Sequence, residues 1–513
     1  MLKLNKLLVL LIITFINIAN AKNNNSNRKF RHPLLAKKDQ VKLSLGKNNN
    51  STDHKKEIYP WLGTFAEVIS LIEKKAFREV DFSNFVQEAL KAAVPHVDAH
   101  SAFFSKKSYQ ETMESTSGKF SGIGVSIISK APEDDTLLIV DVIQSGPAYK
   151  AGLKGGDKII EVDGEKLRGL STDEVINKLK GKNGTIVQLK IIREKKPLEF
   201  KIKREIIKDP TSFCYHFPDQ NIYYISLKIF NQPAAKQVSE LLKKANKGKA
   251  KGLIIDLRRN PGGILNSAID MAELFLPKKS LVVTTKNKFG EITSQYYTRR
   301  KATLSSNIPI FILVDNFSAS ASEILAGCLQ YYSKKLIDPK TKKSKLMVFL
   351  VGTSTFGKGS VQEVIPISNG CALKLTVDLY YLPNDVSIQA KGIDPDFLVK
   401  PKMIPSEEMQ WVQDLYGKEQ SLKHHISEEE VKTGIKEETK KEKEEETKEK
   451  TWEEKQKEAI NKDTQIKASL NLINLLDFAR KCNPNIVNTR AKALNFLKRN
   501  FITDEAINIE KVK

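Results

Sequence analysis

The sequence predicts a multidomain α/β protein, with a helical N-terminal region, a β-rich module carrying two helices, an α/β core and further helices at its C-terminus. Three observations support this fold class. Patterns typical of strands and helices alternate between residues 221 and 331, as expected for βαβ units. Short strand patterns punctuated by glycine precede that region, and a Glu- and Lys-rich stretch separates it from a last apolar helix pattern.

Length and composition limit the classes of protein that fit. The 513 residues allow about three domains, and 40% hydrophobic residues are enough to form cores. The formal net charge of +23 comes from lysines scattered through every region, without a basic stripe interleaved with aromatic residues, so nucleic acid is not an expected partner. The four cysteines lie far apart in the sequence, so no disulfide framework, metal site or cofactor is predicted.

Residues 1–21 have the three parts of a signal peptide. Lysines at the start precede a mostly apolar run, Leu7–Ile18, and a small-x-small cleavage site at Ala19–Ala21. The apolar run is short for a membrane span, although an uncleaved membrane anchor stays open as an alternative. We therefore expect an exported protein, located in the periplasm or at the outer face of the inner membrane in a Gram-negative-type cell, and secreted otherwise.

Two stretches precede the β-rich module. Residues 22–56, rich in Asn, Lys and Ser, show no apolar period and are predicted to be a disordered linker. Residues 57–117 are predicted to be a helical region, because apolar residues recur there at intervals of three and four positions. We expect these apolar side chains, among them Trp61 and Phe65, to form core contacts.

Glycines and short strand patterns define a module at residues 118–206. Its first turn, Gly122-Ile123-Gly124-Val125, allows several backbone N–H groups to converge on one anion. With the short helix, strand and second helix that follow, the pattern resembles a PDZ domain. In such a domain the turn holds a peptide's C-terminal carboxylate while the peptide adds as a strand. Val175 and Leu179, four positions apart on the second helix, would line the groove.

The α/β core is predicted over residues 207–405. Strand patterns at 221–229 and 252–257 flank an amphipathic helix, which predicts a βαβ unit in a mainly parallel sheet. Gly262 and Gly263 follow the second strand, at the sheet edge where open α/β folds place their sites. From the residues alone they form either a tight turn or a turn that frees backbone N–H groups.

A serine lies at a junction between a strand and a helix. The apolar run Ile308–Val314 is followed by a helix pattern that starts at Ala321, so Ser320 exposes its hydroxyl at a helix N-terminus. Orphan N–H groups and the helix dipole favour developing negative charge at such a position. Ser320 and Glu323 also have the spacing of a capping box, so this stretch alone indicates either a nucleophile or a helix cap.

A second strand pattern, at residues 349–352, leads into a glycine-rich turn that contains a single lysine, Lys358. The spacing of Gly352, Gly357 and Lys358 also fits a P-loop. However, a glycine follows the lysine where a P-loop requires Ser or Thr, and the next residues have a strand pattern rather than a helix pattern. Both features argue against nucleotide binding.

Together these stretches resemble the C-terminal processing peptidases, tail-specific serine proteases of peptidase family S41 that use a Ser–Lys dyad. Ser318–Ile324 matches the family pattern S-A-S-A-S-E-I, and Thr355–Gln362 matches T-F-G-K-G-x-V-Q. Asp256–Gly263 matches D-L-R-x-N-x-G-G, and the whole resemblance, with the PDZ-like region, covers residues 58–401.

The resemblance implies roles for individual residues. Ser320 would be the nucleophile, Lys358 the general base, and Gln362 the residue that orients the lysine. The oxyanion hole would be formed by backbone N–H groups from among three residues, Gly262, Gly263 and Ala321.

Desolvation of Lys358 is the physical requirement of this mechanism, because the amine of an exposed lysine stays protonated at neutral pH. We expect Phe356 and Val361 to supply an apolar pocket. No histidine lies near the motif stretches, which argues against a Ser–His–Asp triad. His100 lies in a stretch that resembles the family's L-D-P-H-S, where the histidine is not catalytic.

The function implied by the resemblance is a serine endopeptidase that cleaves exported proteins, selected by the PDZ domain through free, apolar C-termini. A catalytically inactive PDZ-containing scaffold that binds peptides stays open as the alternative. The resemblance also suggests two further partners, a second copy of the chain bound through the N- and C-terminal helices and an adaptor protein.

Three segments complete the predicted organisation. An insertion at about residues 334–346 separates Ser320 from Lys358 by more than the family's usual interval and is expected to form a surface hairpin. Residues 406–462, dense in Glu and Lys, are predicted to be a charged linker. Residues 463–513 are predicted to be a helical region, and Asp463–Leu476 resembles the family's terminal helix, which either packs back on the core or pairs with another subunit.

Overall fold

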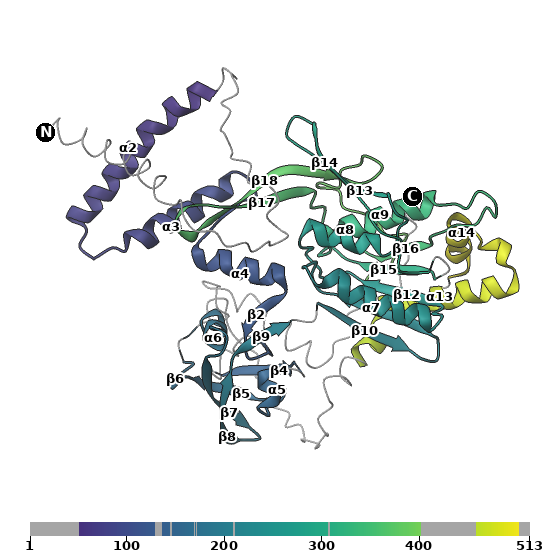
Figure 1. The fold of residues 1–513 in the computed structure, drawn as a ribbon, viewed down its shortest axis with the longest axis horizontal. Coiled ribbons are helices and arrows are strands. Elements are labelled where there is room, and N and C mark those ends of the chain that lie inside the picture. The colour runs from purple at the N-terminus through teal and green to yellow at the C-terminus, as the bar shows by residue number, and fades with distance from the viewer. Residues whose placement is uncertain are drawn as a thin grey trace, which may run out of the picture. The chain divides into compact units, whose positions relative to one another are not determined.

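The structure is a computed structural model that describes residues 51–128, 136–143, 146–168, 170, 172–208, 211–305, 308–401 and 458–501 (Figure 1). The chain divides into two compact units, Met1–Phe85 and Val86–Lys513. The predicted signal peptide, most of the predicted linker and nearly all of the charged segment lie outside the described residues. Within the described ranges, no helix combines the length and the apolar character needed to cross a membrane.

The first unit contains α2 (Ser51–Lys75) and the start of α3 (Phe82–Ala93). Because α2 begins at Ser51, the last six residues of the predicted linker, 51–56, are helical rather than disordered. The expectation of core contacts is wrong for Trp61, whose side chain is 73% exposed. Phe65 stacks on Phe85, with their ring centroids 6.5 Å apart.

The β-rich module pairs its strands in the order β3-β4-β5-β7-β8, with β6 on β5, and β2 pairs separately with β9. Among the described residues β3 pairs only with β4, so β3 is an edge strand. The elements are β2 (Lys119–Gly122), β3 (Val125–Ile128), β4 (Leu137–Val142), α5 (Pro147–Lys150), β5 (Lys158–Val162), β6 (Glu165–Lys166), α6 (Thr172–Leu179), β7 (Ile186–Arg193), β8 (Lys196–Lys203) and β9 (Glu205–Lys208).

A six-stranded sheet forms the centre of the α/β core, in the order β10-β11-β12-β15-β16-β19. All neighbours in it are parallel except β10 and β11, as the predicted βαβ pattern requires. Its strands are β10 (Ser212–Phe217), β11 (Ile222–Leu227), β12 (Gly252–Asp256), β15 (Ile310–Val314), β16 (Val348–Gly352) and β19 (Phe397–Leu398).

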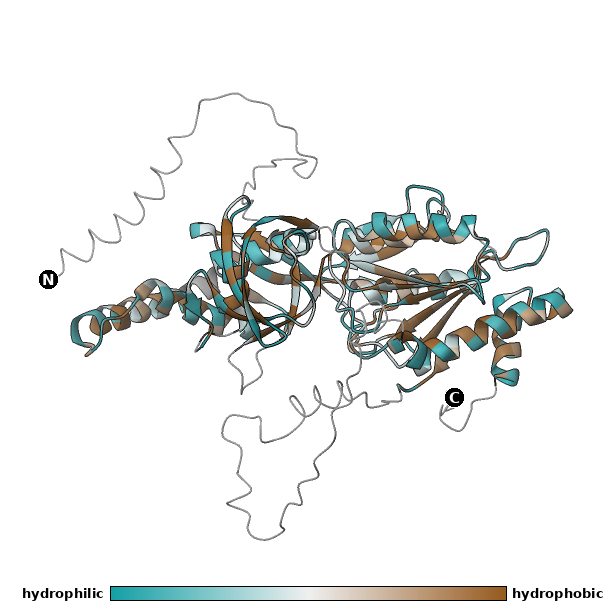
Figure 2. Ribbon diagram, turned by 90° about the horizontal axis from the view of Figure 1, so that it is seen from below, coloured by the Kyte–Doolittle hydropathy of each residue, from teal (hydrophilic) through white to brown (hydrophobic). Residues whose placement is uncertain are grey.

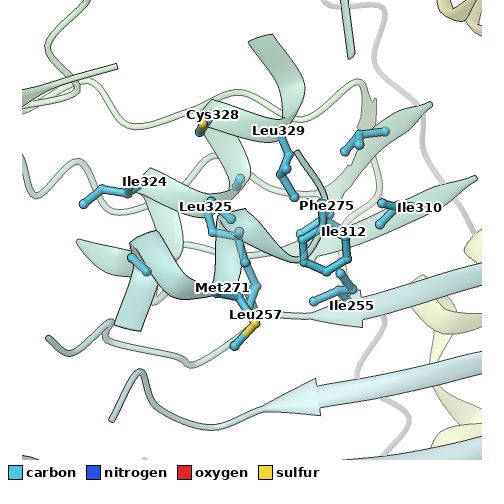
Figure 3. Packing of buried hydrophobic residues seen from close by; sticks show 14 of the residues in the cluster. Ile255, Leu257, Met271, Phe275, Ile310, Ile312, Ile324, Leu325, Cys328 and Leu329 are labelled. Carbon is cyan, nitrogen blue, oxygen red and sulfur yellow. The ribbon is translucent and has the colours of Figure 1, made fainter. Parts of the chain in front are cut away.

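Helices cover both faces of this sheet. Alternate residues of its strands point to opposite sides, and the side chains on both sides are apolar and need to be covered. Ile255 and Ile312 pack on one face against α8 and α9, as Figure 3 shows. Ile254 and Phe311 pack on the other face with the C-terminal helices. In Figure 2 the strands of this sheet are mostly hydrophobic. The helices are α7 (Ala234–Lys247), α8 (Leu265–Glu273), α9 (Ala321–Lys335), α13 (Thr464–Cys482) and α14 (Arg490–Asn500).

A second sheet lies beside the end of the lysine-containing turn. Its strands run in the order β1-β18-β13-β14, and β17 pairs with β18 in an antiparallel ladder that has an irregularity between Val361 and Gln362. A bulge of this kind re-aims the side chains that follow it. The elements of this region are η1 (Val94–His96), β1 (Ala102–Phe104), α4 (Lys106–Ser117), β13 (Leu281–Lys286), β14 (Ile292–Tyr297), β17 (Ser360–Pro366), η2 (Ser368–Gly370) and β18 (Ala372–Tyr381).

Two arginines hold the C-terminal helices on the core. Arg258 donates to Gln465 Oε1 at 2.6 Å and forms an ion pair with Asp463 at 2.8 Å, both at the start of α13. Arg490, at the start of α14, forms a buried ion pair with Asp396 at 2.6 Å. Removing one member of such a buried pair leaves an uncompensated charge, so these bonds make the helices part of the core.

The predicted insertion folds as a small antiparallel turn. Ile337 and Ser344 form an isolated β-bridge, and the Ser344 N–H donates to the carbonyl of Asn488 at 3.0 Å. The extra residues therefore leave β16 in its place beside β15.

Candidate active site

Three neighbouring parallel strands, β12, β15 and β16, end at the same edge of the core sheet (Figure 1). The chain leaves them through loops at residues 257–264, 315–320 and 353–359. Open α/β sheets collect their site residues at the carboxyl ends of the strands, so chemistry is expected at this edge. The serine, the two glycines and the lysine predicted from the sequence all lie on these loops.

Ser320 has backbone angles that are unusual for a serine, with φ 56° and ψ −113°. A residue other than glycine in this conformation stores strain, which the surrounding packing must offset. Gly262 shows how closely the neighbouring loop approaches. A Cβ on Gly262 would lie 2.6 Å from the Ala319 carbonyl oxygen and 2.9 Å from Ser320 Cβ. The glycine therefore allows the 257–264 loop to pack against the turn that carries Ser320.

Glu323 is fully buried and connects the serine turn to the lysine turn. Its Oε2 accepts hydrogen bonds from the backbone N–H groups of Ser320 (2.8 Å) and Lys358 (2.9 Å). Its Oε1 accepts from the Thr355 hydroxyl (2.6 Å) and the Gly357 N–H (2.7 Å). Burial raises the pKa of the Glu323 carboxyl, and these four donors oppose that shift. The capping-box spacing thus predicts only one of the four bonds, that from the Ser320 N–H.

Lys358, Gln362 and Ser320 line one cavity of about 240 Å³. Lys358 Nζ donates to Gln362 Oε1. Burial lowers the pKa of the Lys358 amine, and the positive charge of Lys374 lowers it further, whereas nearby carboxylates raise it. The structure therefore brings the predicted nucleophile, base and orienting residue together around one space.

The predicted apolar pocket for Lys358 is only partly correct. Val361 lines the cavity, but the side chain of Phe356 is 59% exposed, so the role expected for Phe356 is wrong. The reason is that the turn is held through its backbone: the Phe356 N–H donates to the Ser318 carbonyl at 3.1 Å. Ile324, from α9, lines the cavity as well.

Tyr380 lies in the site, although no pattern in the sequence predicts it there. It is 2% exposed, lines the cavity, and its hydroxyl donates to the Lys358 carbonyl. Burial and the charge of Glu323 raise the pKa of Tyr380 well above its usual value, whereas a hydrogen bond with the Ser320 side chain lowers it. The alternating pattern of this strand predicts on which face of the sheet Tyr380 lies, but it does not distinguish a site residue from a core tyrosine.

Gln362 is held at the amide nitrogen as well. Gln362 Nε2 donates to Ser360 Oγ at 2.8 Å and to Thr376 Oγ1 at 3.2 Å. Neither hydroxyl was predicted as a site group, since single hydroxyls on strands carry no sequence signal. His100 lies within range of the site: burial lowers the pKa of its imidazole, and the positive charge of Lys358 lowers it further.

The three residues predicted for an oxyanion hole are not equally placed to offer a backbone N–H group to a substrate. The Gly262 N–H donates to Asn260 Oδ1 at 2.9 Å, so it is already bound. Gly263 and Ala321 both line the cavity with Ser320. Gly263 has φ 146°, and a Cβ there would lie 2.2 Å from the Phe230 carbonyl oxygen, so this position requires glycine.

The predicted peptide-binding residues lie in the β-rich module. The turn Gly122–Val125 connects β2 to β3, and Gly124 has φ 80°, a conformation that favours glycine. Ile123, Val175 and Leu179 pack together in the core of the module, with 2%, 0% and 4% of their surfaces exposed. The structure thus brings the α6 residues together with the turn, as buried side chains.

Comparisons with known proteins match both the α/β core and the β-rich module. A family model described as peptidase family S41 matches residues 221–399, and a PDZ domain model matches residues 110–192. The carboxy-terminal-processing protease of Bartonella bacilliformis is 31% identical over 382 residues, which cover 73% of this chain and 83% of that protein. The carboxy-terminal processing protease CtpB of Bacillus subtilis is 32% identical over 338 residues, which cover 64% of this chain and 66% of that protein.

Among solved structures, the photosystem II D1 C-terminal processing protease is 22% identical, with a TM-score of 0.38. The match covers 70% of this chain and 92% of that chain.

Proposed function

Because the chain belongs to the carboxy-terminal processing proteases of peptidase family S41 and is a serine-type endopeptidase, we propose that it cuts exported proteins with a Ser320–Lys358 dyad after selecting them by their C-terminal tails. One observation supports the dyad above all others. Ser320, Lys358 and Gln362 line the same cavity, while one carboxylate oxygen of Glu323 accepts from the backbone of both dyad residues.

In the proposed reaction, neutral Lys358 takes the proton of the Ser320 hydroxyl while Oγ attacks the peptide carbonyl. Gln362 accepts an N–H of the amine, which leaves the lone pair on nitrogen for the incoming proton. Burial lowers the pKa of Lys358, so more of the amine is neutral at a given pH. The lysine then gives its proton to the leaving amine, and water, deprotonated by the same lysine, hydrolyses the acyl-enzyme.

We assign the oxyanion hole to the backbone N–H groups of Ala321 and Gly263, which both line the cavity. Gly262 is left out of the pair because its N–H binds Asn260. One donor of this kind is typically worth about 3 kcal/mol of transition-state stabilisation.

Selection of substrates is assigned to the PDZ module. The edge of β3 is free among the described residues, so a peptide can add to it as a further strand. The turn Gly122–Val125 stands at the start of that strand and would bind the terminal carboxylate. Val175 and Leu179, buried with Ile123, would accept the last apolar side chain once the groove opens around it.

Location and further partners are also proposed. The pattern at residues 1–21, which lie outside the described part, supports export to the periplasm or the outer face of the inner membrane. N-terminal sequencing of the protein recovered from cells decides between cleavage after Ala21 and an uncleaved anchor. A second copy bound through the terminal helices and an adaptor protein remain proposals, which cross-linking in cells followed by mass spectrometry tests.

The endopeptidase activity is tested with an unstructured protein that ends in apolar residues and a free C-terminal carboxylate. Wild-type protein is expected to cut it at sites upstream of the tail, and mass spectrometry of the products locates them. Ser320→Ala, shown by thermal unfolding to be folded, is the blank for this assay. If the wild type gives no more product than Ser320→Ala, the chain acts only as a peptide-binding scaffold toward such tails.

Amidation of the substrate's C-terminus is expected to raise KM at least about tenfold, because it removes the charge that the turn would bind through charge-assisted hydrogen bonds. Cleavage rates of the free-acid and amidated peptides, measured over a range of concentrations, give the ratio. Acetylation of the N-terminus is the matched control, since it changes a charge at the other end and should leave KM within about twofold. Equal KM values for the free acid and the amide would rule out selection through the carboxylate.

A further inference from the structure

A chain of side-chain hydrogen bonds connects Asp98 to Lys358. Thr376 Oγ1 donates to Asp98 Oδ1 at 3.0 Å, and Gln362 Nε2 donates to Thr376 Oγ1 at 3.2 Å. At the other end of the same amide, Gln362 Oε1 accepts from Lys358 Nζ. We propose that Asp98 is a positioning residue for Lys358, which acts by fixing the end of the Gln362 amide that faces the amine; this inference rests on the dyad proposed above.

The direction of each bond follows from what each group can donate. An ionised carboxylate only accepts, so Thr376 must direct its single hydroxyl hydrogen at Asp98. Toward Gln362, Thr376 can then only accept, which turns the amide nitrogen to Thr376 and the amide oxygen to Lys358. The second bond of that nitrogen, to Ser360 Oγ at 2.8 Å, fits the same orientation. A neutral lysine needs this acceptor so that its lone pair stays directed at the nucleophile.

Asp98 is held in its ionised form. The Ser101 hydroxyl donates to one carboxylate oxygen, and the N–H groups of His100 and Ser101 donate to the other at 2.8 and 3.0 Å. These bonds, that of the Ser101 hydroxyl most of all, lower the pKa of Asp98 to about 2. The carboxylate is therefore an acceptor at every pH at which a lysine base can work.

The fold fixes Asp98 at this place through the second sheet. β1 pairs with β18 immediately after the Asp98 loop, and the Thr376 N–H donates to Ser101 Oγ at 3.2 Å. Gln362 and Thr376 lie opposite each other in the β17–β18 ladder. The loop that carries Asp98 thus comes from a segment 278 positions before Thr376, on the far side of the PDZ module in the sequence.

Thr376→Val is the sharpest test, because it replaces the hydroxyl by a methyl group of similar shape and keeps the preference for a strand. We expect kcat on the tailed substrate to fall at least about tenfold, with KM within about twofold. Thr376→Ser restores the hydroxyl and should keep at least about a third of the wild-type kcat. Thr293→Val, the same change at an exposed position on β14 of the same sheet, lies outside this bond chain and should stay within about twofold of wild type.

Asp98→Asn adds a readout that a merely structural role would not change. The amide can donate as well as accept, so the orientation of Gln362 is no longer fixed and kcat should fall by a factor similar to that of Thr376→Val. The negative charge of Asp98 favours protonated Lys358, so its removal should also shift the acid limb of the pH–kcat/KM profile to lower pH. The other ionisable groups near the amine, Lys374, Glu323 and His100, are unchanged in this variant.

Wild-type kcat in both Thr376→Val and Asp98→Asn would overturn the inference, whatever the pH profile of Asp98→Asn, while leaving the dyad intact. Full activity of Ser320→Ala or Lys358→Ala in the same assay would instead remove the dyad itself. Because the Asp98 carboxylate also holds two N–H groups of its loop, Asp98→Asn can fail to fold. In that case the comparison of Thr376→Val with Thr376→Ser decides alone.

Discussion

Lys358→Ala is expected to lower kcat at least about 10⁴-fold, the scale seen when one member of a nucleophile–base pair is removed. Of the cavity-lining residues in the described part of the chain, Lys358 alone carries an amine. Tyr380 cannot replace it as a base, because burial raises the pKa of the Tyr380 hydroxyl well above its ordinary value. Cleavage of the tailed substrate, followed by mass spectrometry over hours, measures the loss.

The pH dependence of the wild type checks the same assignment. Only neutral Lys358 can accept the Ser320 proton, so kcat/KM should rise with pH as the ammonium loses its proton. Burial places the pKa of Lys358 below that of an exposed lysine, and the rise should be complete at a correspondingly lower pH. Lys391 is an exposed lysine on the loop beside the turn that carries Lys358. The variant Lys391→Ala is the matched control and should leave the profile unchanged. Cleavage by folded Lys358→Ala near the wild-type rate would exclude Lys358 as the base.

The three loops of the site could be predicted from the sequence because each carries its own local signals, an apolar strand followed by glycines or a polar residue. Their convergence follows from the parallel order of β12, β15 and β16. Glu323 shows the limit of such local signals. Its spacing from Ser320 predicted one hydrogen bond within a helix turn, whereas its other bonds come from the loop 32 to 35 positions later.

Other residues could not be predicted because their roles depend on packing between distant segments. Tyr380 enters the cavity from the second sheet, and Asp98 reaches Thr376 across 278 positions. Trp61 belongs to a helix pattern that indicates an apolar face, but a periodic pattern does not specify what covers that face, and the side chain is 73% exposed. Phe356 is apolar and adjacent to the site in sequence, yet the backbone bonds of its turn leave the ring exposed.

Glu323→Gln is expected to lower kcat at least about 100-fold and to lower the free energy of unfolding by about 2–5 kcal/mol. The change keeps the shape of the side chain but replaces one acceptor oxygen by a donor. Two of the four groups that now donate to Glu323, either Thr355 and Gly357 or Ser320 and Lys358, would then face an amide N–H in a buried site. Either choice loosens one of the two turns that carry the dyad.

Two measurements distinguish the role of Glu323 in holding the two turns from the effect of losing its charge alone. Thermal unfolding reports the unpaired donors, and kcat at the pH of maximal activity reports the geometry of the dyad after any shift in the pKa of Lys358 is allowed for. Glu363→Gln, the same change at an exposed position on β17, should alter neither quantity by more than about twofold in kcat or 0.5 kcal/mol in stability. Since one carboxylate binds both turns, kcat and stability must fall together; a variant that lost stability but kept the wild-type kcat would mean that the dyad geometry is set elsewhere.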